Sequence, residues 1–169
     1  TGAIGLDTNA FTAEEDFGTS GTKWQASNSW RDFYVTTLTT YSGPANLQNA
    51  LIYSDNIYFA KAGMKIGKQN FMNQLNALGF AKKISFEQEL AMSTYSNNSS
   101  FDTETQLANT GYGQGELLVN PVHMAMIYSS FANEGNMLQA YLIYKEDKTP
   151  NYYAEQVFSK ETANTIKKD

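Results

Sequence analysis

The 169-residue sequence contains no cysteine and only one histidine, His123. Without cysteine the chain has no disulfides and no thiolate metal sites, and a single imidazole is too few for a histidine-built metal site. The missing cysteines fit a cytosolic protein and an exported one equally, so they leave the compartment open. We therefore expect no metal and no cofactor, and for His123 a structural role, either exposed or with its ring nitrogens satisfied.

Basic residues and long apolar runs are also scarce. The chain has 12 Lys and Arg against 17 Asp and Glu, which gives a net charge of −5. This charge repels phosphate backbones, and no cluster of Lys and Arg interleaves with the aromatic residues to reverse it locally. Polar residues interrupt every apolar stretch, and the first residues lack the basic region of a signal peptide. We expect neither a nucleic-acid partner nor a membrane-spanning segment in this chain.

What remains is the composition of a globular protein, with 41% apolar, 14% aromatic and 17% charged residues. The length suits one domain or a large piece of one, which buries roughly 70% of its unfolded surface when it folds. Residues 1–6 resemble the end of an apolar helix, and residues 160–169 resemble the beginning of another. We therefore expect the chain to be part of a longer protein.

Periodicity and turn residues predict a mainly α fold with a few short strands. We expect an irregular, aromatic-anchored segment over 7–29, an extended segment over 33–41, and a second irregular segment over 80–101. The expected helices begin near Ala45, at 57–67, at 71–79, after a cap at Asp102, and at Pro121 behind an Asn120 cap. Two strands are expected over 137–144 and 152–158 around a turn at 148–150. The helix after Asn120 has an apolar face predicted from four residues: Met124, Ile127, Tyr128 and Phe131.

The tripeptide Ser54-Asp55-Asn56 is the main candidate for chemistry, although such a tripeptide alone often just caps a helix or makes a turn. Leu47, Ala50, Leu51 and Ser54 follow helical spacing, which predicts that Ser54 extends an apolar stripe. One apolar helix is followed directly by another here, with no obvious helix end to cap. We therefore expect a buried hydroxyl and amide at this junction.

In that context the tripeptide resembles the second motif of penicillin-binding proteins and serine β-lactamases, whose set is Ser-x-x-Lys, Ser-x-Asn and Lys-Ser/Thr-Gly. The segment 111–121, Gly-Tyr-Gly-Gln-Gly-Glu-Leu-Leu-Val-Asn-Pro, with the helix after it, resembles the corresponding part of class B penicillin-binding transpeptidases. Trp24, Gln25 and Trp30 further resemble the low-affinity branch associated with β-lactam resistance in Gram-positive bacteria. Two matched segments in the expected order carry the resemblance.

The resemblance implies that residues 1–169 are a partial transpeptidase domain, the truncated helical lobe of the α/β fold of serine penicillin-recognising enzymes. The parent protein would cross-link peptidoglycan stem peptides through an acyl-serine intermediate and bind β-lactams covalently. It would be extracytoplasmic and anchored in the cell membrane through a segment outside this chain. Its partners would be stem peptides, β-lactams and the cell-division or cell-wall machinery.

The resemblance also assigns roles to residues. Ser54 would relay a proton to the departing amine, Asn56 would hold the substrate's amide, and Asp55 would have a structural role. Tyr112 and Gln114 would border the floor of the active site, and Phe33 and Tyr34 would line the cleft. The alternatives are a glycine-rich turn for close backbone packing in the first case, and plain core aromatics in the second.

Two literal matches to the other motifs are rejected. Ser20-Gly-Thr-Lys23 lies in a polar, glycine-containing segment that favours a loop, whereas the nucleophile begins a buried helix that puts Ser and Lys on one face. Lys148-Thr149-Pro150 contains a proline that removes a backbone donor and indicates a turn. We expect the nucleophile upstream of Thr1 and the third motif beyond the helix that begins near Lys160, so this chain alone should be inactive.

Two other classes remain open from the sequence. A β-lactam-sensing receptor domain uses the same motifs for binding, although the segment that begins at Gly111 fits transpeptidases better. A non-catalytic helical interaction module, in which Ser54 and Asn56 only satisfy the interior, is the third possibility.

Overall fold

The computed structural model describes residues 1–144, 146 and 149–168. The chain folds into two compact units. The first comprises residues 1–71 and 101–115, and the second comprises residues 72–100 and 116–168. Helices dominate and the strands have two or three residues each, so the predicted mainly α fold with a few short strands is confirmed.

The first unit is built around one long helix. Its elements are α1 (Gly2–Asp7), β1 (Lys23–Trp24), the 3-10 turn η1 (Asn28–Trp30), β2 (Val35–Thr36), α2 (Leu47–Ile52), α3 (Asn56–Ile66) and α5 (Glu104–Gly111). Strands β1 and β2 pair antiparallel, with Trp24 opposite Val35. The extended segment expected over 33–41 is therefore a strand at only two positions.

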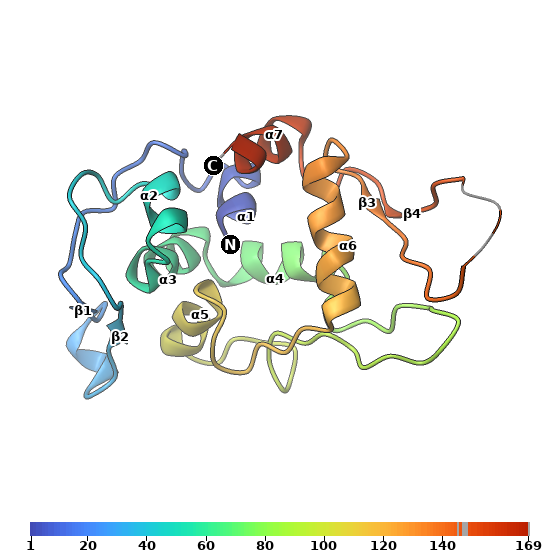
Figure 1. Cartoon of the computed structure of the whole chain (residues 1–169). Helices are drawn as coiled ribbons and strands as arrows, with labels where there is room; N and C mark the ends of the chain where they lie inside the picture. The colour runs from blue at the N-terminus through green and yellow to red at the C-terminus, as the bar shows by residue number, and fades with distance from the viewer. Residues whose placement is uncertain (145, 147–148, 169) are drawn as a thin grey trace. The chain divides into compact units, whose positions relative to one another are not determined.

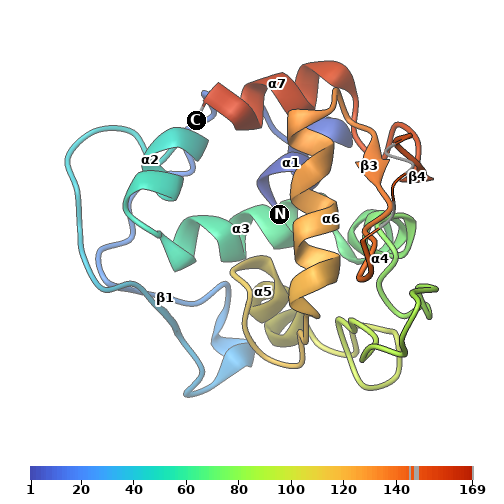
Figure 2. The ribbon, with the colours of Figure 1, turned by 45° about the vertical axis from the view of Figure 1, so that its right-hand side comes forward.

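Helices α3 and α5 lie side by side in the first unit (Figure 1, Figure 2). Glycines permit this close approach: a Cβ on Gly111 would collide with the carbonyl oxygen of Phe59, and one on Gly63 would stand 3.1 Å from the Cα of Gly111. A buried cluster forms beside them, and its members are Trp30, Val35, Ile57, Ala60 and Ala108. This core holds the N-terminal half of α3 in place.

Several helix starts in this unit follow side-chain caps. Asn46 caps α2 by accepting from the backbone N–H of Asn49 at 3.0 Å, so the helix begins after Pro44 rather than on it. Thr103 caps α5 by accepting from the N–H of Gln106 at 3.1 Å. The expected cap at Asp102 is therefore wrong by one residue, because the Thr103 hydroxyl is the oxygen that reaches an unpaired N–H of the first turn.

The second unit contains the helix that local signals predict best. Helix α6 (Pro121–Ala132) begins with Asn120 as its cap, whose side chain accepts from the N–H of Val122 at 2.8 Å, and with proline at the first helical position. The other elements are α7 (Lys160–Lys168), β3 (Met137–Leu138) and β4 (Tyr152–Ala154), while α4 (Lys68–Ala77) begins in the first unit and ends in the second. Strands β3 and β4 pair antiparallel over a shorter length than expected. The expected turn at 148–150 includes Lys148, which lies outside the described residues.

The buried face of α6 differs from the predicted one. Met124 and Tyr128 are exposed, whereas His123, Met126, Ile127 and Ser130 are buried. The polar residues can be buried because their atoms have partners inside the unit; the Ser130 hydroxyl, for example, donates to the carbonyl of Ile127 at 2.6 Å. A prediction from apolar side chains alone therefore assigns the wrong buried face to α6.

Within the described part of the chain, every helix is too short or too polar to cross a membrane.

Candidate functional site

Ser54 lies between two helices rather than on one. Helix α2 ends at Ile52, and Ser54 then adopts a left-handed backbone with φ of 52° before α3 begins at Asn56. The Ser54 side chain is exposed, so the expectation that it extends a buried apolar stripe is wrong. The reason is that α2 stops after six residues and the chain turns, which rotates Ser54 away from the face of Leu47 and Ala50. A left-handed conformation costs a non-glycine residue about 1–2 kcal/mol, so surrounding contacts must hold it.

Asp55 is the cap of α3. One of its carboxylate oxygens accepts from the backbone N–H groups of Ile57 at 2.9 Å and Tyr58 at 3.2 Å. The other accepts from the hydroxyl of Tyr41 at 2.9 Å. The carboxylate is buried, and negative charge at a helix N-terminus is favourable. The expectation of a junction with no helix end to cap is therefore wrong.

Asn56 is the first residue of α3 and is half-buried. Its amide nitrogen donates to the carbonyl oxygen of Thr36, at the end of β2, at 2.9 Å. This bond uses one of the two N–H groups, which leaves the amide oxygen and one N–H for another partner. Ser54 and Asn56 therefore flank a fixed carboxylate and both retain hydrogen-bonding capacity.

Tyr41 is a contact that sequence reasoning missed. Its ring stacks on the ring of Tyr53, with centroids 4.5 Å apart and planes 7° apart, while its hydroxyl donates to Asp55. Burial raises the pKa of Tyr41, and the hydrogen bond to the Asp55 carboxylate raises it further, so the phenol stays protonated as a donor. Nothing in the sequence distinguishes Tyr41 from the other tyrosines, because its partners come from a different segment.

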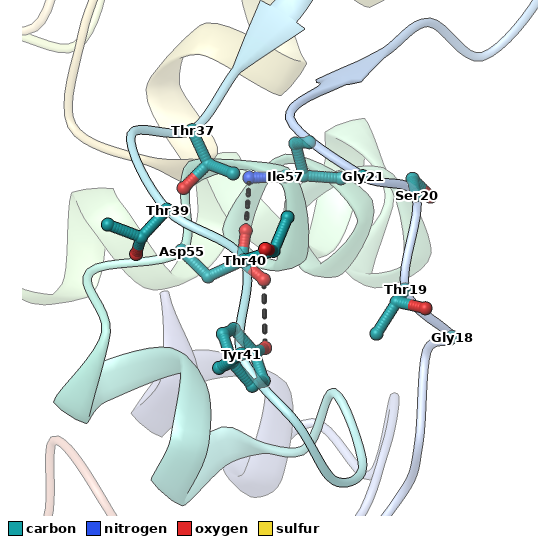
Figure 3. Close-up of a pocket in the computed structure, with 10 residues that line it drawn as sticks. All are labelled: Gly18, Thr19, Ser20, Gly21, Thr37, Thr39, Thr40, Tyr41, Asp55 and Ile57. Carbon is teal, nitrogen blue, oxygen red and sulfur yellow. Dashed lines mark hydrogen bonds between the residues drawn. The ribbon is translucent and has the colours of Figure 1, made fainter.

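A polar pocket lies beside this cap. It is lined by residues 18–21 and by Thr37, Thr39, Thr40 and Tyr41, with Asp55 and Ile57, and has a cavity volume of about 140 Å³ (Figure 3). The Thr37 hydroxyl is buried and has no hydrogen-bond partner among the described residues. Figure 3 shows the Asp55 carboxylate held between the N–H of Ile57 and the hydroxyl of Tyr41. The pocket thus offers mainly hydroxyl groups, next to a carboxylate whose oxygens are already paired.

Ser20, the serine of the rejected Ser-x-x-Lys match, lies in a loop and its hydroxyl accepts from Lys61 at 2.8 Å. Lys61 also donates to the carbonyls of Phe17 and Gly18, each at 3.0 Å, and burial lowers its pKa. Lys23 instead places its ammonium over the ring of Tyr34, 3.7 Å from the centroid. Ser20 and Lys23 therefore do not form a helical Ser/Lys pair, and Lys61 fixes the loop.

Across residues 1–144, 146 and 149–168, no three histidine, aspartate or glutamate side chains converge as a metal site would require.

The comparisons with known proteins agree with this geometry. A family model described as the penicillin binding protein transpeptidase domain matches residues 1–169. The chain belongs to this family. Penicillin-binding protein 3 of Bacillus subtilis (strain 168) is 35% identical over 166 residues, which cover 98% of this chain and 25% of that protein. The chain therefore spans about a quarter of the length of this curated relative.

Solved penicillin-binding proteins share the fold. The transpeptidase domain of penicillin-binding protein 3 from Burkholderia pseudomallei matches with a TM-score of 0.83 at 18% identity, over 98% of this chain and 48% of that one. The D,D-transpeptidase domain of a peptidoglycan glycosyltransferase from Eggerthella lenta matches with a TM-score of 0.79 at 20% identity, over 99% and 44%. The predicted recognition, part of a class B penicillin-binding transpeptidase domain, is confirmed, and the non-catalytic module is not favoured.

The transpeptidase segment that begins at Gly111 has a structural explanation at each glycine. Gly111 ends α5 where it touches α3, whereas Gly113 and Gly115 have φ of 82° and 78°, in the region that favours glycine. Gln114 is exposed between them, and the Tyr112 hydroxyl donates to the side chain of Asn109. This geometry accounts for the glycines without a ligand, and substrate contact by Tyr112 or Gln114 stays a prediction.

The two aromatic residues that the family resemblance suggests for the cleft, Phe33 and Tyr34, lie in different surroundings. Phe33 packs on Trp30, with ring centroids 5.7 Å apart, and joins Tyr112 on the buried cluster of the first unit. Tyr34 is exposed and covered in part by the ammonium of Lys23. Phe33 and Tyr112 thus pack against the same buried cluster, while a cleft-lining role for Phe33 and Tyr34 stays a prediction.

Proposed function

We propose that the protein containing this chain is a peptidoglycan D,D-transpeptidase, with Ser54 and Asn56 as catalytic residues and Asp55 as their structural support. The observation that carries the proposal is the exposed Ser54 beside a buried, triply hydrogen-bonded Asp55, within a chain that the transpeptidase family model matches over its whole length. Two side chains with free hydrogen-bonding capacity on one rigid turn suit the binding of a peptide and the transfer of a proton.

The proposed reaction is acyl transfer in two steps. A serine outside residues 1–169 attacks the carbonyl carbon of the D-Ala-D-Ala bond; its oxygen–carbon bond forms, the carbon–nitrogen bond breaks and terminal D-Ala leaves. An amine of a neighbouring stem peptide then attacks the ester, which forms a new amide and returns a proton to the serine oxygen. β-lactams would acylate the same serine.

Within that reaction Ser54 would pass a proton to the departing nitrogen, because an alkylamine needs protonation before it leaves. Its hydroxyl can do so since it both donates and accepts. Asn56 would hold the substrate's amide with its free amide oxygen and remaining N–H. Tyr112, Gln114, Phe33 and Tyr34 would contact substrate more peripherally.

The parent protein would act on stem peptides at the outer face of the cytoplasmic membrane, anchored through a segment outside this chain. Cell-division or cell-wall proteins would be its partners. A stem peptide and a β-lactam both present an amide next to the reactive carbonyl, and Asn56 would bind that amide.

Covalent labelling of the full-length protein with a fluorescent penicillin tests the proposal. We expect one labelled serine, located by mass spectrometry outside residues 1–169, and slower labelling after Ser54→Ala by roughly the 10²–10⁴-fold typical of losing a proton-transfer group. Ser20→Ala is the matched control and should label like the wild type. No labelling of the wild type, or labelling on Ser20, would overturn the proposal.

A further inference from the structure

One side chain, Tyr41, contacts both neighbours of Ser54. Its ring stacks on Tyr53, the residue before Ser54, at 4.5 Å between centroids. Its hydroxyl donates to the carboxylate of Asp55, the residue after Ser54, at 2.9 Å. Ser54 is therefore flanked on each side by a residue that the same tyrosine holds.

Ser54 itself depends on such support. Its backbone is left-handed, and its hydroxyl makes no hydrogen bond to any described residue. The position of its Cβ, and with it the region that the hydroxyl can reach, is therefore set by the backbone that runs from Tyr53 through Asp55. A left-handed non-glycine residue persists only where its surroundings fix it.

The support comes from one continuous segment. Thr36, at the start of that segment, accepts the hydrogen bond from the Asn56 amide at 2.9 Å, and Tyr41, at its end, holds Tyr53 and Asp55. Residues 36–41 thus cross the whole motif and touch a residue on each side of Ser54. The Asp55 carboxylate, which accepts from Tyr41, also caps α3. This cap ties the motif to the core of the first unit.

We propose that Tyr41 is a positioning residue for Ser54, whose ring and hydroxyl together fix the backbone turn that places the Ser54 side chain for proton transfer. This inference rests on the proposed transpeptidase function. The ring contributes through Tyr53 and the hydroxyl through Asp55, so the two contributions separate experimentally. Tyr41 acts through Ser54 and touches no substrate.

The test uses the full-length protein and the rate constant for acylation by a fluorescent penicillin. Tyr41→Phe keeps the stacked ring and removes the hydroxyl, and should slow acylation roughly tenfold to a hundredfold, the loss that a misplaced catalytic group produces. Tyr53→Phe is the matched control, because it keeps the same stack and removes a hydroxyl that bonds to no described residue. It should acylate like the wild type.

A double-mutant cycle distinguishes positioning from a general structural role. If Tyr41 acts through Ser54, Tyr41→Phe should have little further effect when Ser54 is already alanine. Hydrogen exchange by mass spectrometry on the peptide covering 53–58 should be faster in Tyr41→Phe and unchanged in Tyr53→Phe.

The outcomes separate a failure of the proposed function from a failure of the positioning role. An unlabelled wild type overturns the proposed function and this inference with it. If the wild type is labelled and Tyr41→Phe is labelled equally fast, the positioning role alone is overturned. The same holds if Tyr41→Phe slows acylation as much in the Ser54→Ala background as in the wild type. Unchanged exchange over residues 53–58 in Tyr41→Phe also overturns it, whatever the labelling.

Discussion

His123 shows how a polar residue becomes part of a core. It is 1% exposed, and its two ring nitrogens lie 2.7 Å from the Ser93 hydroxyl and 2.8 Å from the carbonyl of Leu78. A carbonyl only accepts, so Nε2 carries the proton and Nδ1 accepts from Ser93. The predicted role with satisfied ring nitrogens therefore describes it well, but its burial needed partners from segments that the sequence does not connect.

Burial lowers the pKa of His123 below its ordinary value of 6.5. We expect the single imidazole resonance in the proton NMR spectrum of the chain to titrate below pH 6.5. Above pH 6.5 the imidazole is neutral in both the folded and the unfolded chain. As the pH falls below 6.5, the unfolded chain takes up a proton that the folded chain resists. His123 therefore lowers the free energy of unfolding as the solution becomes more acidic.

The variant Ser93→Ala tests how the hydrogen bond from Ser93 affects the pKa of His123. It removes the donor to Nδ1, which favours the neutral ring, so the pKa of His123 should rise toward 6.5. Ser85→Ala, at an exposed serine, should leave the resonance unchanged. An imidazole that titrates at or above 6.5 in the unaltered chain would contradict the buried, neutral ring.

At the motif, the sequence singles out Ser54, Asp55 and Asn56 but does not reveal how they are arranged. Ser54, Asp55 and Asn56 could be selected from their order and context, because these are properties of the chain itself. The end of α2 at Ile52 and the left-handed turn at Ser54 could not, since helical spacing continues through both. Tyr41 supplies the contact that stabilises this turn, and its proximity exists only in the folded chain.

At the scale of elements, the sequence predicts a helix or strand boundary well when the residues that set it are adjacent in the chain. Helix α6 was predicted correctly at its start because Asn120 and Pro121 are adjacent in sequence and act on the first turn directly. The strands over 137–144 and 152–158 were predicted too long because pairing, rather than propensity, sets where a strand ends. The sequence allows the segment that begins at Gly111 to be a glycine-rich turn for close backbone packing, but the partner, Phe59 on α3, is known only from the folded chain.

Gly111→Ala tests that packing. The new Cβ would meet the backbone of Phe59, which cannot turn aside as a side chain can, so we expect the free energy of unfolding of the first unit to fall by about 3 kcal/mol. Urea unfolding followed by tryptophan fluorescence measures it, because Trp24 and Trp30, the two tryptophans of the chain, lie in this unit.

Gly113→Ala is the matched control. No atom lies within 4 Å of its Cβ position, so it should cost only the roughly 1 kcal/mol of a left-handed backbone. Equal losses for Gly111→Ala and Gly113→Ala would contradict the helix contact as the reason for the first glycine of this segment.

At the scale of the whole molecule, the sequence predicted one partial domain, and the structure groups its residues into two compact units. Residues 101–115 join the first unit although 29 residues of the second, 72–100, precede them in the chain. Each unit is therefore discontinuous in sequence, which no local pattern reveals. The match of one family model to residues 1–169 is what unites the two units in a transpeptidase domain.

A fluorescent penicillin should not label the 169-residue chain by itself. Ser20 begins the one Ser-x-x-Lys of the sequence, but its hydroxyl accepts a hydrogen bond from Lys61. Lys23 lies over the ring of Tyr34 instead of beside Ser20. A nucleophilic serine needs a base that takes its proton, and an ammonium that donates to its oxygen does not do so. Mass spectrometry after incubation checks this, with the full-length protein as the positive control. An adduct on Ser20 would mean that the pairing with Lys61 activates the serine, and the nucleophile would then lie within these residues.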